Sequence, residues 1–304
     1  MKFNPLKSFL LGVSIGGVAG RTEADAQQWS GQLVEPPIFV FPMIESPGPA
    51  ILDTRVMSQQ VVTAVKEQQI YFHGPEEWRE EILFFSKKVW QELCSKWAGE
   101  SLTVAPITVS FRRVPPGIDG LALVDFDGER MLPVTLVINP EAKNVLNAIR
   151  HELAHVLLRA LCGPRIPQWI DEGGAVTAEV RAAFLQYKDH LVHDYLHSGK
   201  RIPLDVMFLS DRQLSGSMDL TFYAQAAGLT SWLISIGPQE SELARRRCLV
   251  QFVRSTIEDG RDVRAHEINL RKYYGISDLG ECEQKWREYV EQQEQQQVSF
   301  GSPR

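Results

Sequence analysis

Two histidines spaced for one face of a helix constrain this chain more than any other feature. Residues 151–155 read His-Glu-Leu-Ala-His, and residues four apart in a helix project from the same face, so both imidazoles can reach one cation. Sixteen residues separate His155 from Glu172, which follows a Gly-Pro break near the start of another predicted helix. Two histidines and one carboxylate leave a fourth tetrahedral position open, as in catalytic zinc sites. The pattern therefore predicts a Zn2+ site formed by His151, His155 and Glu172.

Length and composition limit the classes of protein to which the chain can belong. Its 304 residues are enough for one large or two modest domains, and 44% apolar with 23% charged residues is typical of a folded globular protein. The net charge of -6 argues against a nucleic-acid partner, because such surfaces usually need a basic patch.

The N-terminus has the features of a secretory signal. Lys2 and Lys7 precede the uncharged apolar run Ser8–Gly20, which is too short to span a bilayer and has the length of a signal-peptide core. We expect residues 1–26 to be a signal peptide, cleaved after Gly20 or after Ala26, and the protein to be exported to the periplasm, cell envelope or medium. A disordered or packed N-terminus is the alternative. Apart from an uncleaved signal acting as an anchor, no stretch predicts a membrane span.

The four cysteines do not form a second metal-binding pattern. Cys94, Cys162, Cys248 and Cys282 lack Cys-x-x-Cys spacing. In an exported protein Cys248 and Cys282 could pair, since both fall in the C-terminal helical region. All four also lie in apolar helical stretches, which slightly favours buried thiols.

The order of predicted elements indicates an α+β fold. Residues 27–66 form a proline-rich lead-in, expected to be extended, and Pro75–Gly99 carries a helical apolar stripe. Strand patterns occur at Gln69–His73, Leu102–Arg113, Leu121–Phe126 and Val134–Ile138. The helix bearing the two histidines is predicted from Glu141 to Gly163.

The C-terminal half of the chain is predicted to be helical. Amphipathic or apolar stretches occur at Phe184–His197, Tyr223–Ile236, Cys248–Thr256, Val263–Tyr274 and Leu279–Gln293. One domain is expected over residues 67–293, with a sheet-bearing half up to about residue 163 and a helical half from about 164. Residues 294–304 are expected to be a disordered tail. Gly173 and Gly174, which are poor helix formers, predict close approach of their helix to the metal-binding helix.

The segment around Glu172 resembles the gluzincin branch of the zincin metallopeptidases. Trp169–Ala175 reads Trp-Ile-Asp-Glu-Gly-Gly-Ala and matches the Trp-hydrophobic-x-Glu-Gly-x-Ala context of the third gluzincin ligand. The chain is also similar to bacterial peptidase MA-like proteins, which share a Tyr-x-Gln-(small) motif, here at Tyr223–Ala226, and a Leu-x-x-x-Glu-x-x-Trp motif, here at Leu279–Trp286. No Gly-x-Met-Glu-Asn loop precedes the metal helix, which weakens an aminopeptidase assignment.

The resemblance implies a zincin-like fold, in which a small mixed or antiparallel sheet and the metal helix precede a mainly helical subdomain. A sheet edge then lies beside the metal, where an extended peptide can pair with it. Tyr223 would steady the oxyanion, although a tyrosine packed in the core is an equal alternative. Glu179 lies seven residues beyond Glu172, on the same predicted helix face, and would accept a hydrogen bond from a zinc-binding histidine; a solvent-facing glutamate is the alternative.

The residues themselves predict zinc-dependent hydrolysis of peptide bonds in a peptide or protein substrate. Glu152 follows the first histidine directly and would act as the general base for a metal-activated water. One alternative is a zincin-like domain that binds a cell-envelope partner or peptide without significant turnover. Another is a purely structural helical protein with fortuitous histidines.

A second group of histidines follows the metal-binding segment. His190, His193 and His197, with Asp189 and Asp194, have spacings that place them along one helix side. They predict either a second metal site or the polar outer face of an amphipathic helix, and the polar face is favoured because the same helix has an apolar side.

Overall fold

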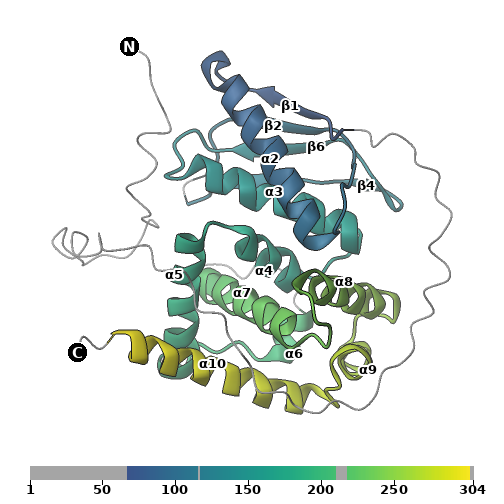
Figure 1. Cartoon of the computed structure of the whole chain (residues 1–304), viewed down its shortest axis with the longest axis vertical. Helices are drawn as coiled ribbons and strands as arrows, with labels where there is room; N and C mark the ends of the chain where they lie inside the picture. The colour runs from purple at the N-terminus through teal and green to yellow at the C-terminus, as the bar shows by residue number, and fades with distance from the viewer. Residues whose placement is uncertain (1–66, 116, 210–217, 302–304) are drawn as a thin grey trace. The chain divides into compact units, whose positions relative to one another are not determined.

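A small sheet and two helices form the first half of the folded chain (Figure 1). The computed structural model describes residues 67–115, 117–209 and 218–301. The predicted signal peptide and the whole proline-rich lead-in lie outside these residues. The elements of the first half are β1 (Ile70–His73), the 3-10 helix η3 (Glu76–Trp78), α2 (Arg79–Trp97), β2 (Ile107–Phe111), β3 (Gly120–Leu123), β4 (Phe126–Asp127), β5 (Arg130–Met131), β6 (Val134–Ile138) and α3 (Val145–Cys162).

The main sheet is mixed and has the strand order β1-β2-β6-β3. β1, β2 and β6 are parallel to one another, whereas β3 is antiparallel to β6 and forms one edge of the sheet. β4 and β5 pair as a separate short hairpin. The register aligns Val109 with Leu136 and Leu136 with Ala122. α2 and α3 pack against the sheet (Figure 1), and the expected α+β class with a small mixed sheet is confirmed.

The second half of the folded chain is helical, as predicted. It comprises α4 (Gln168–Ala178), α5 (Arg181–Val192), the π-helix η4 (His193–His197), α6 (Leu204–Leu209), α7 (Met218–Ile236), α8 (Glu242–Glu258), α9 (Val263–Tyr274) and α10 (Leu279–Gly301). No helix among the described residues is both long and apolar enough to cross a membrane.

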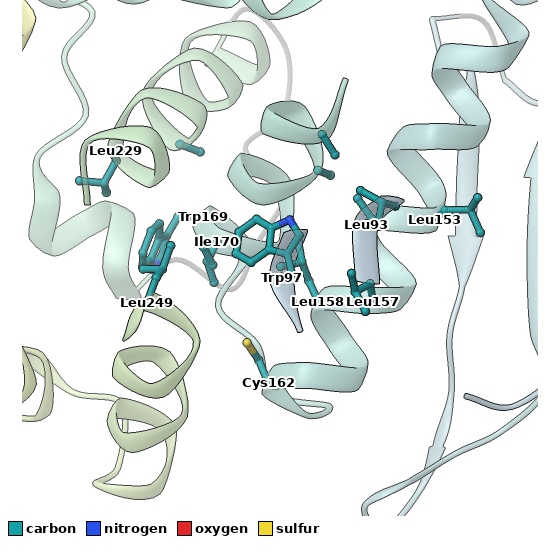
Figure 2. Close-up of a cluster of buried hydrophobic side chains, with 14 of the residues drawn as sticks. Leu93, Trp97, Leu153, Leu157, Leu158, Cys162, Trp169, Ile170, Leu229 and Leu249 are labelled. Atoms are coloured by element: carbon teal, nitrogen blue, oxygen red, sulfur yellow. The ribbon is translucent and has the colours of Figure 1, made fainter. Parts of the chain in front are cut away.

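A shared core holds α4, which carries Glu172, against α3, which carries His151 and His155. Figure 2 shows buried side chains from both helices together with Trp97 of α2 and Leu249 of α8. Trp169 of α4 and Leu157 of α3 are fully buried. Burying a large apolar side chain contributes about 1.5–3 kcal/mol, so the relative position of the two helices is set by packing as well as by polar contacts.

The two glycines of α4 face different neighbours. A Cβ on Gly174 would lie 2.5 Å from Cδ1 of Leu158 on α3, as predicted for close approach to the metal helix. A Cβ on Gly173 would instead collide with the backbone oxygen of Ala226 and the hydroxyl of Thr230, both on α7. The expectation that both glycines face α3 is therefore wrong for Gly173, because successive helical residues project about 100° apart.

The prediction of a disordered tail over residues 294–304 is wrong for residues 294–301, because α10 continues to Gly301. Glutamine and glutamate, which dominate this stretch, have favourable helix propensities. Oε1 of Glu294 also lies 2.6 Å from Nε2 of His197, which connects the extension to η4.

All four cysteines are buried free thiols. The possible pairing of Cys248 with Cys282 is not formed, and the favoured alternative of buried thiols is observed.

Candidate metal site

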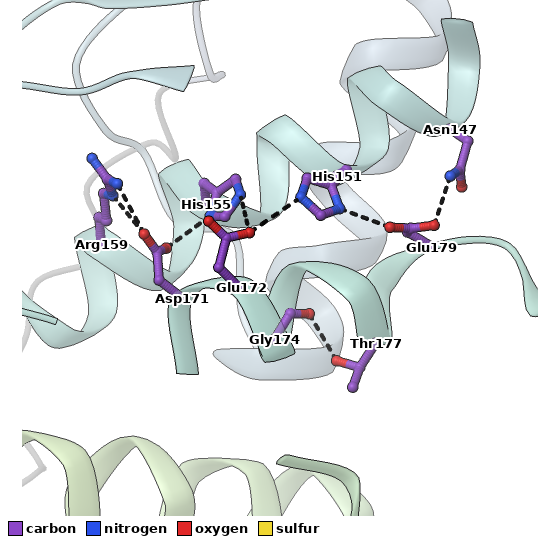
Figure 3. A network of polar contacts seen from close by, with 9 residues as sticks. All are labelled: Asn147, His151, His155, Arg159, Asp171, Glu172, Gly174, Thr177 and Glu179. Atoms are coloured by element: carbon purple, nitrogen blue, oxygen red, sulfur yellow. Dashed lines mark hydrogen bonds and ion pairs between the residues drawn. The ribbon is translucent and has the colours of Figure 1, made fainter. Parts of the chain in front are cut away.

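One face of α3 carries four polar side chains at intervals of four residues: Asn147, His151, His155 and Arg159. The helix begins after Asn144, whose side chain accepts a hydrogen bond from the backbone N–H of Asn147 at 2.9 Å. Figure 3 shows this face opposite α4 and the residues that follow it. The helical period therefore brings both histidines to the carboxylates of the α4 segment.

Three potential ligand atoms converge between α3 and α4. Nε2 of His151 and Nε2 of His155 lie 3.8 and 3.6 Å from Oε2 of Glu172. These separations are too long for hydrogen bonds. The ligand atoms all lie within 4.8 Å of one another, and this is the one such group of three or more His, Cys, Asp or Glu side chains in the part of the chain that the structure describes.

The other nitrogen of each imidazole is hydrogen-bonded to a carboxylate. Nδ1 of His151 lies 2.8 Å from Oε1 of Glu179, and Nδ1 of His155 lies 2.8 Å from Oδ1 of Asp171. A carboxylate can only accept, so Nδ1 carries the proton and Nε2 of a neutral ring keeps its lone pair. This arrangement fixes the tautomer that a metal-binding histidine needs.

The distances between Glu172 and the two histidines fit a zinc ion with a small adjustment. Tetrahedral zinc with bonds of about 2.1 Å separates its ligand atoms by about 3.4 Å. The distances from Glu172 to the two histidines are only slightly longer than this value. Two imidazoles and one carboxylate would hold the ion and leave one position open.

Charge is concentrated at this site. Burial lowers the pKa of His151, but the carboxylates of Glu172 and Glu179 outweigh that effect, so its pKa lies well above the ordinary value. Burial also lowers the pKa of His155, but the charges of Asp171 and Glu172 outweigh that effect, so its pKa lies above the ordinary value. The metal-free site therefore holds protons tightly, and a metal ion would compete with them.

Glu152 lies beside the converging ligands and beneath the sheet edge. Its side chain is buried, and burial raises its pKa above the ordinary value for glutamate. The backbone of Ala122 on β3 acts in the opposite direction and lowers this pKa. A Cβ on Gly120 would lie 2.8 Å from Oε1 of Glu152, so the absence of a side chain at Gly120 gives this carboxylate its space.

Glu179 reaches His151 from a position that differs from the expected one. α4 ends at Ala178, and Glu179 has extended backbone angles (φ -63°, ψ 168°) rather than continuing the helix. The expectation that it shares a helix face with Glu172 is wrong, because the chain leaves the helix one residue earlier. Its carboxylate nevertheless makes the hydrogen bond to His151 described above.

Two tyrosines are candidates for steadying an oxyanion. Tyr223 is half-buried on α7, where its ring lies edge-on to Phe222, and its catalytic role stays a prediction. Tyr187 of α5 was not singled out from the sequence. Burial raises its pKa, and the negative charges of Glu179, Glu172 and Asp119 add to the rise. No motif in the sequence distinguishes Tyr187 from any other tyrosine on an amphipathic helix.

The second group of histidines makes separate contacts. His193 pairs through Nδ1 with Asp194 at 3.0 Å, whereas His197 contacts Glu294 of α10. Asp194 also accepts a hydrogen bond from Thr221 of α7 at 2.6 Å. Among the described residues these side chains do not form a metal-binding group, and they connect η4 to its neighbouring helices.

The polar residues of the two C-terminal motifs, Tyr223–Ala226 and Leu279–Trp286, contact the chain between η4 and α6. Gln225 is fully buried; its Oε1 accepts from the backbone of Ile202, and its Nε2 donates to the backbone oxygen of Lys200. Glu283 accepts hydrogen bonds from the hydroxyl of Tyr195 and from the backbone of Leu204. Both residues thus hold the segment between η4 and α6.

Comparison with known proteins identifies no relative. No protein-family model matches the chain, and no significant match is found among curated proteins or solved structures.

Proposed function

We propose that the protein is a zinc-dependent hydrolase that cleaves peptide bonds. The observation that carries this proposal is the convergence of His151, His155 and Glu172, with both Nδ1 atoms engaged and both Nε2 atoms directed at Glu172. Isolated surface histidines would not need buried carboxylate acceptors. The proposal includes a zincin-like fold of the gluzincin type, which the Trp169–Ala175 segment resembles.

A zinc ion held by these three residues would supply Lewis acidity and lower the pKa of a bound water. Glu152 is next in sequence to His151 and is buried beside the ligands. It would accept the proton of the attacking water and pass it to the leaving amine. Its raised pKa suits this double role, because a group that both takes and gives a proton works best near the ambient pH. Tyr187 or Tyr223 would donate a hydrogen bond to the oxyanion.

The edge strand β3 supports a peptide as the substrate. Among the described strands β3 pairs with β6 on one side only, and a Cβ on Gly120 of β3 would lie 2.8 Å from Oε1 of Glu152, the proposed general base. An extended peptide can add to such an edge through main-chain hydrogen bonds. Leu121 and Leu123 are exposed on this strand and would contact alternate side chains of the bound peptide.

The test combines metal analysis with cleavage of a mixed peptide library. We expect the purified chain to contain one zinc ion, to cleave library peptides detected by mass spectrometry, to lose activity with a chelator and to regain it with zinc. Zinc without cleavage would favour a binding domain with no turnover. Absence of metal, with stability unchanged by chelation, would favour a structural helical protein.

A further inference from the structure

The two carboxylates that accept from the histidines are themselves held by side chains of α3. Asn147 precedes His151 by four residues, and Arg159 follows His155 by four. We infer that Asn147 and Arg159 are positioning residues, each fixing the carboxylate that orients one zinc-binding histidine. This inference rests on the proposed zinc site and assigns to it two residues that touch neither the ion nor the substrate.

Asp171 divides its two oxygens between His155 and Arg159. Oδ1 lies 2.8 Å from Nδ1 of His155, while Oδ2 accepts from Nε and Nη2 of Arg159 at 3.0 and 2.9 Å (Figure 3). The Asp171 side chain is only 7% exposed, whereas that of Arg159 is 31% exposed. A buried carboxylate needs both charge compensation and defined hydrogen bonds. Arg159 supplies both and leaves one oxygen for the histidine.

Glu179 divides its oxygens in the same way between His151 and Asn147. Oε1 lies 2.8 Å from Nδ1 of His151, and Oε2 accepts from Nδ2 of Asn147 at 2.8 Å. Oδ1 of Asn147 accepts in turn from the backbone N–H of Val180 at 3.0 Å. Because Glu179 lies beyond the end of α4, helix geometry does not fix it. The two hydrogen bonds of Asn147 connect that chain segment to α3.

The two positions differ in charge, which gives the inference a specific consequence. Arg159 is a cation and offsets the charge of Asp171, whereas the neutral Asn147 leaves the charge of Glu179 in place. Loss of Arg159 would leave a buried carboxylate without its counter-charge. Loss of Asn147 would take one hydrogen bond from the Glu179 carboxylate, which is 6% exposed, but it would remove no counter-charge. Zinc affinity should therefore fall further on loss of Arg159.

The test measures zinc affinity by competition with a chromogenic chelator and records the absorption spectrum of the Co2+-substituted protein. Partners that orient metal-binding histidines typically contribute 10- to 100-fold to affinity or activity. We expect Asn147→Ala to weaken zinc binding roughly tenfold and Arg159→Gln by closer to a hundredfold. Arg159→Lys, which keeps the charge but loses the planar fork, should fall between Arg159→Gln and wild type. The Co2+ spectrum should change in Asn147→Ala and in the Arg159 variants.

Two matched controls come from the same helix. Asn144→Ala removes the N-cap of α3, and Arg150→Gln removes an ion pair with Glu92 of α2 at 2.8 Å. Both variants should lose stability but keep the zinc affinity and the Co2+ spectrum of wild type. If Arg159→Gln does not fold, Arg159→Lys carries that arm of the test.

The outcomes separate this inference from the proposed function. Wild-type affinity and spectrum in Asn147→Ala and the Arg159 variants, in a protein that binds zinc, would overturn the inference and leave the zinc site in place. Equal losses in the two controls would also overturn it, since the effect would then reflect stability alone. A wild-type chain that binds no zinc would overturn the proposed site and this inference together.

Discussion

Each histidine of the site uses its two ring nitrogens differently. Nδ1 is hydrogen-bonded to a buried carboxylate, and Nε2 is directed at Glu172. The carboxylate makes the ring a better electron donor and limits its rotation. Glu152, between the two histidines in sequence, has no such partner on α3 and contacts β3 instead. The site therefore separates the groups suited to holding a metal from the group suited to moving a proton.

A substitution at Gly120 tests the placement of Glu152, the proposed general base. In Gly120→Ala the new methyl group would lie 2.8 Å from Oε1 and 2.9 Å from Cγ of Glu152, so the carboxylate must move. Because small displacements of a catalytic group can reduce rates about 100-fold, we expect a loss of kcat between roughly tenfold and 100-fold. Zinc affinity should stay within about threefold of wild type, since no ligand is touched. Unchanged kcat would show that Glu152 does not need its observed position.

The central residues of the site were predictable because a helix has a fixed period. His151, Glu152 and His155 follow from four-residue spacing, and the surrounding sequence singles out Glu172. The contact of Asp171 with His155 was not predicted. Which of the adjacent carboxylates Asp171 and Glu172 faces each histidine depends on how α4 is rotated about its axis against α3. That rotation is set by tertiary packing, which a single sequence does not show.

Among the elements, α4 packs between α3 and α7, and so connects the helix that carries both histidines to the helical second half of the chain. Gly174 faces Leu158 of α3, and Gly173 faces the backbone of α7. The close packing on α7 fixes α4 from the side opposite the site. The position of Glu172 thus depends on a helix contact that contains no metal ligand.

The α4–α7 contact predicts an asymmetry between two neighbouring glycines. Gly173→Ala meets rigid backbone at Ala226, so overpacking should destabilise the protein by about 3 kcal/mol or more. Gly174→Ala meets the flexible end of Leu158 and should cost less. Gly280→Ala, in the first turn of α10, serves as the control and should be neutral or slightly stabilising. Chemical denaturation measures all three variants, and equal effects at Gly173 and Gly174 would contradict the assigned helix contacts.

Element types were predicted more successfully than element ends. Val134–Ile138 and Val263–Tyr274 match the predicted ranges, because turn and capping residues bound both segments. α3 begins at Val145 rather than near Glu141, because the N-cap residue Asn144 sets its start. α10 runs past its predicted end, where Glu294 contacts His197. The two residues are far apart in the sequence, so this contact could not be predicted from local patterns.

For the whole molecule, metal binding and folding stability should be linked through pH. In the metal-free protein the pKa values of both histidines are raised. Their contribution to stability is therefore fully present below the unfolded pKa of about 6.5 and is lost as pH rises through the folded values. Zinc requires neutral imidazoles and displaces these protons. The increase in Tm caused by zinc should consequently be larger at pH 8 than at pH 6.

Thermal unfolding with and without zinc at the two pH values measures this linkage. His155→Gln, which lacks one ligand, is the control and should show little zinc effect at either pH. A stabilisation by zinc that is equal at pH 6 and pH 8 would show that the histidines are not protonated in the metal-free protein.

Comparison of wild type with Glu152→Gln tests the central claim most directly. The substitution keeps the size of the side chain and leaves His151, His155 and Glu172 unchanged, but it removes the group that accepts a proton. Zinc content and the rate of peptide hydrolysis are measured on the same samples. We predict one zinc ion per chain in both proteins, with hydrolysis reduced about 1000-fold or more in the variant. Full activity in Glu152→Gln would contradict the proposed mechanism.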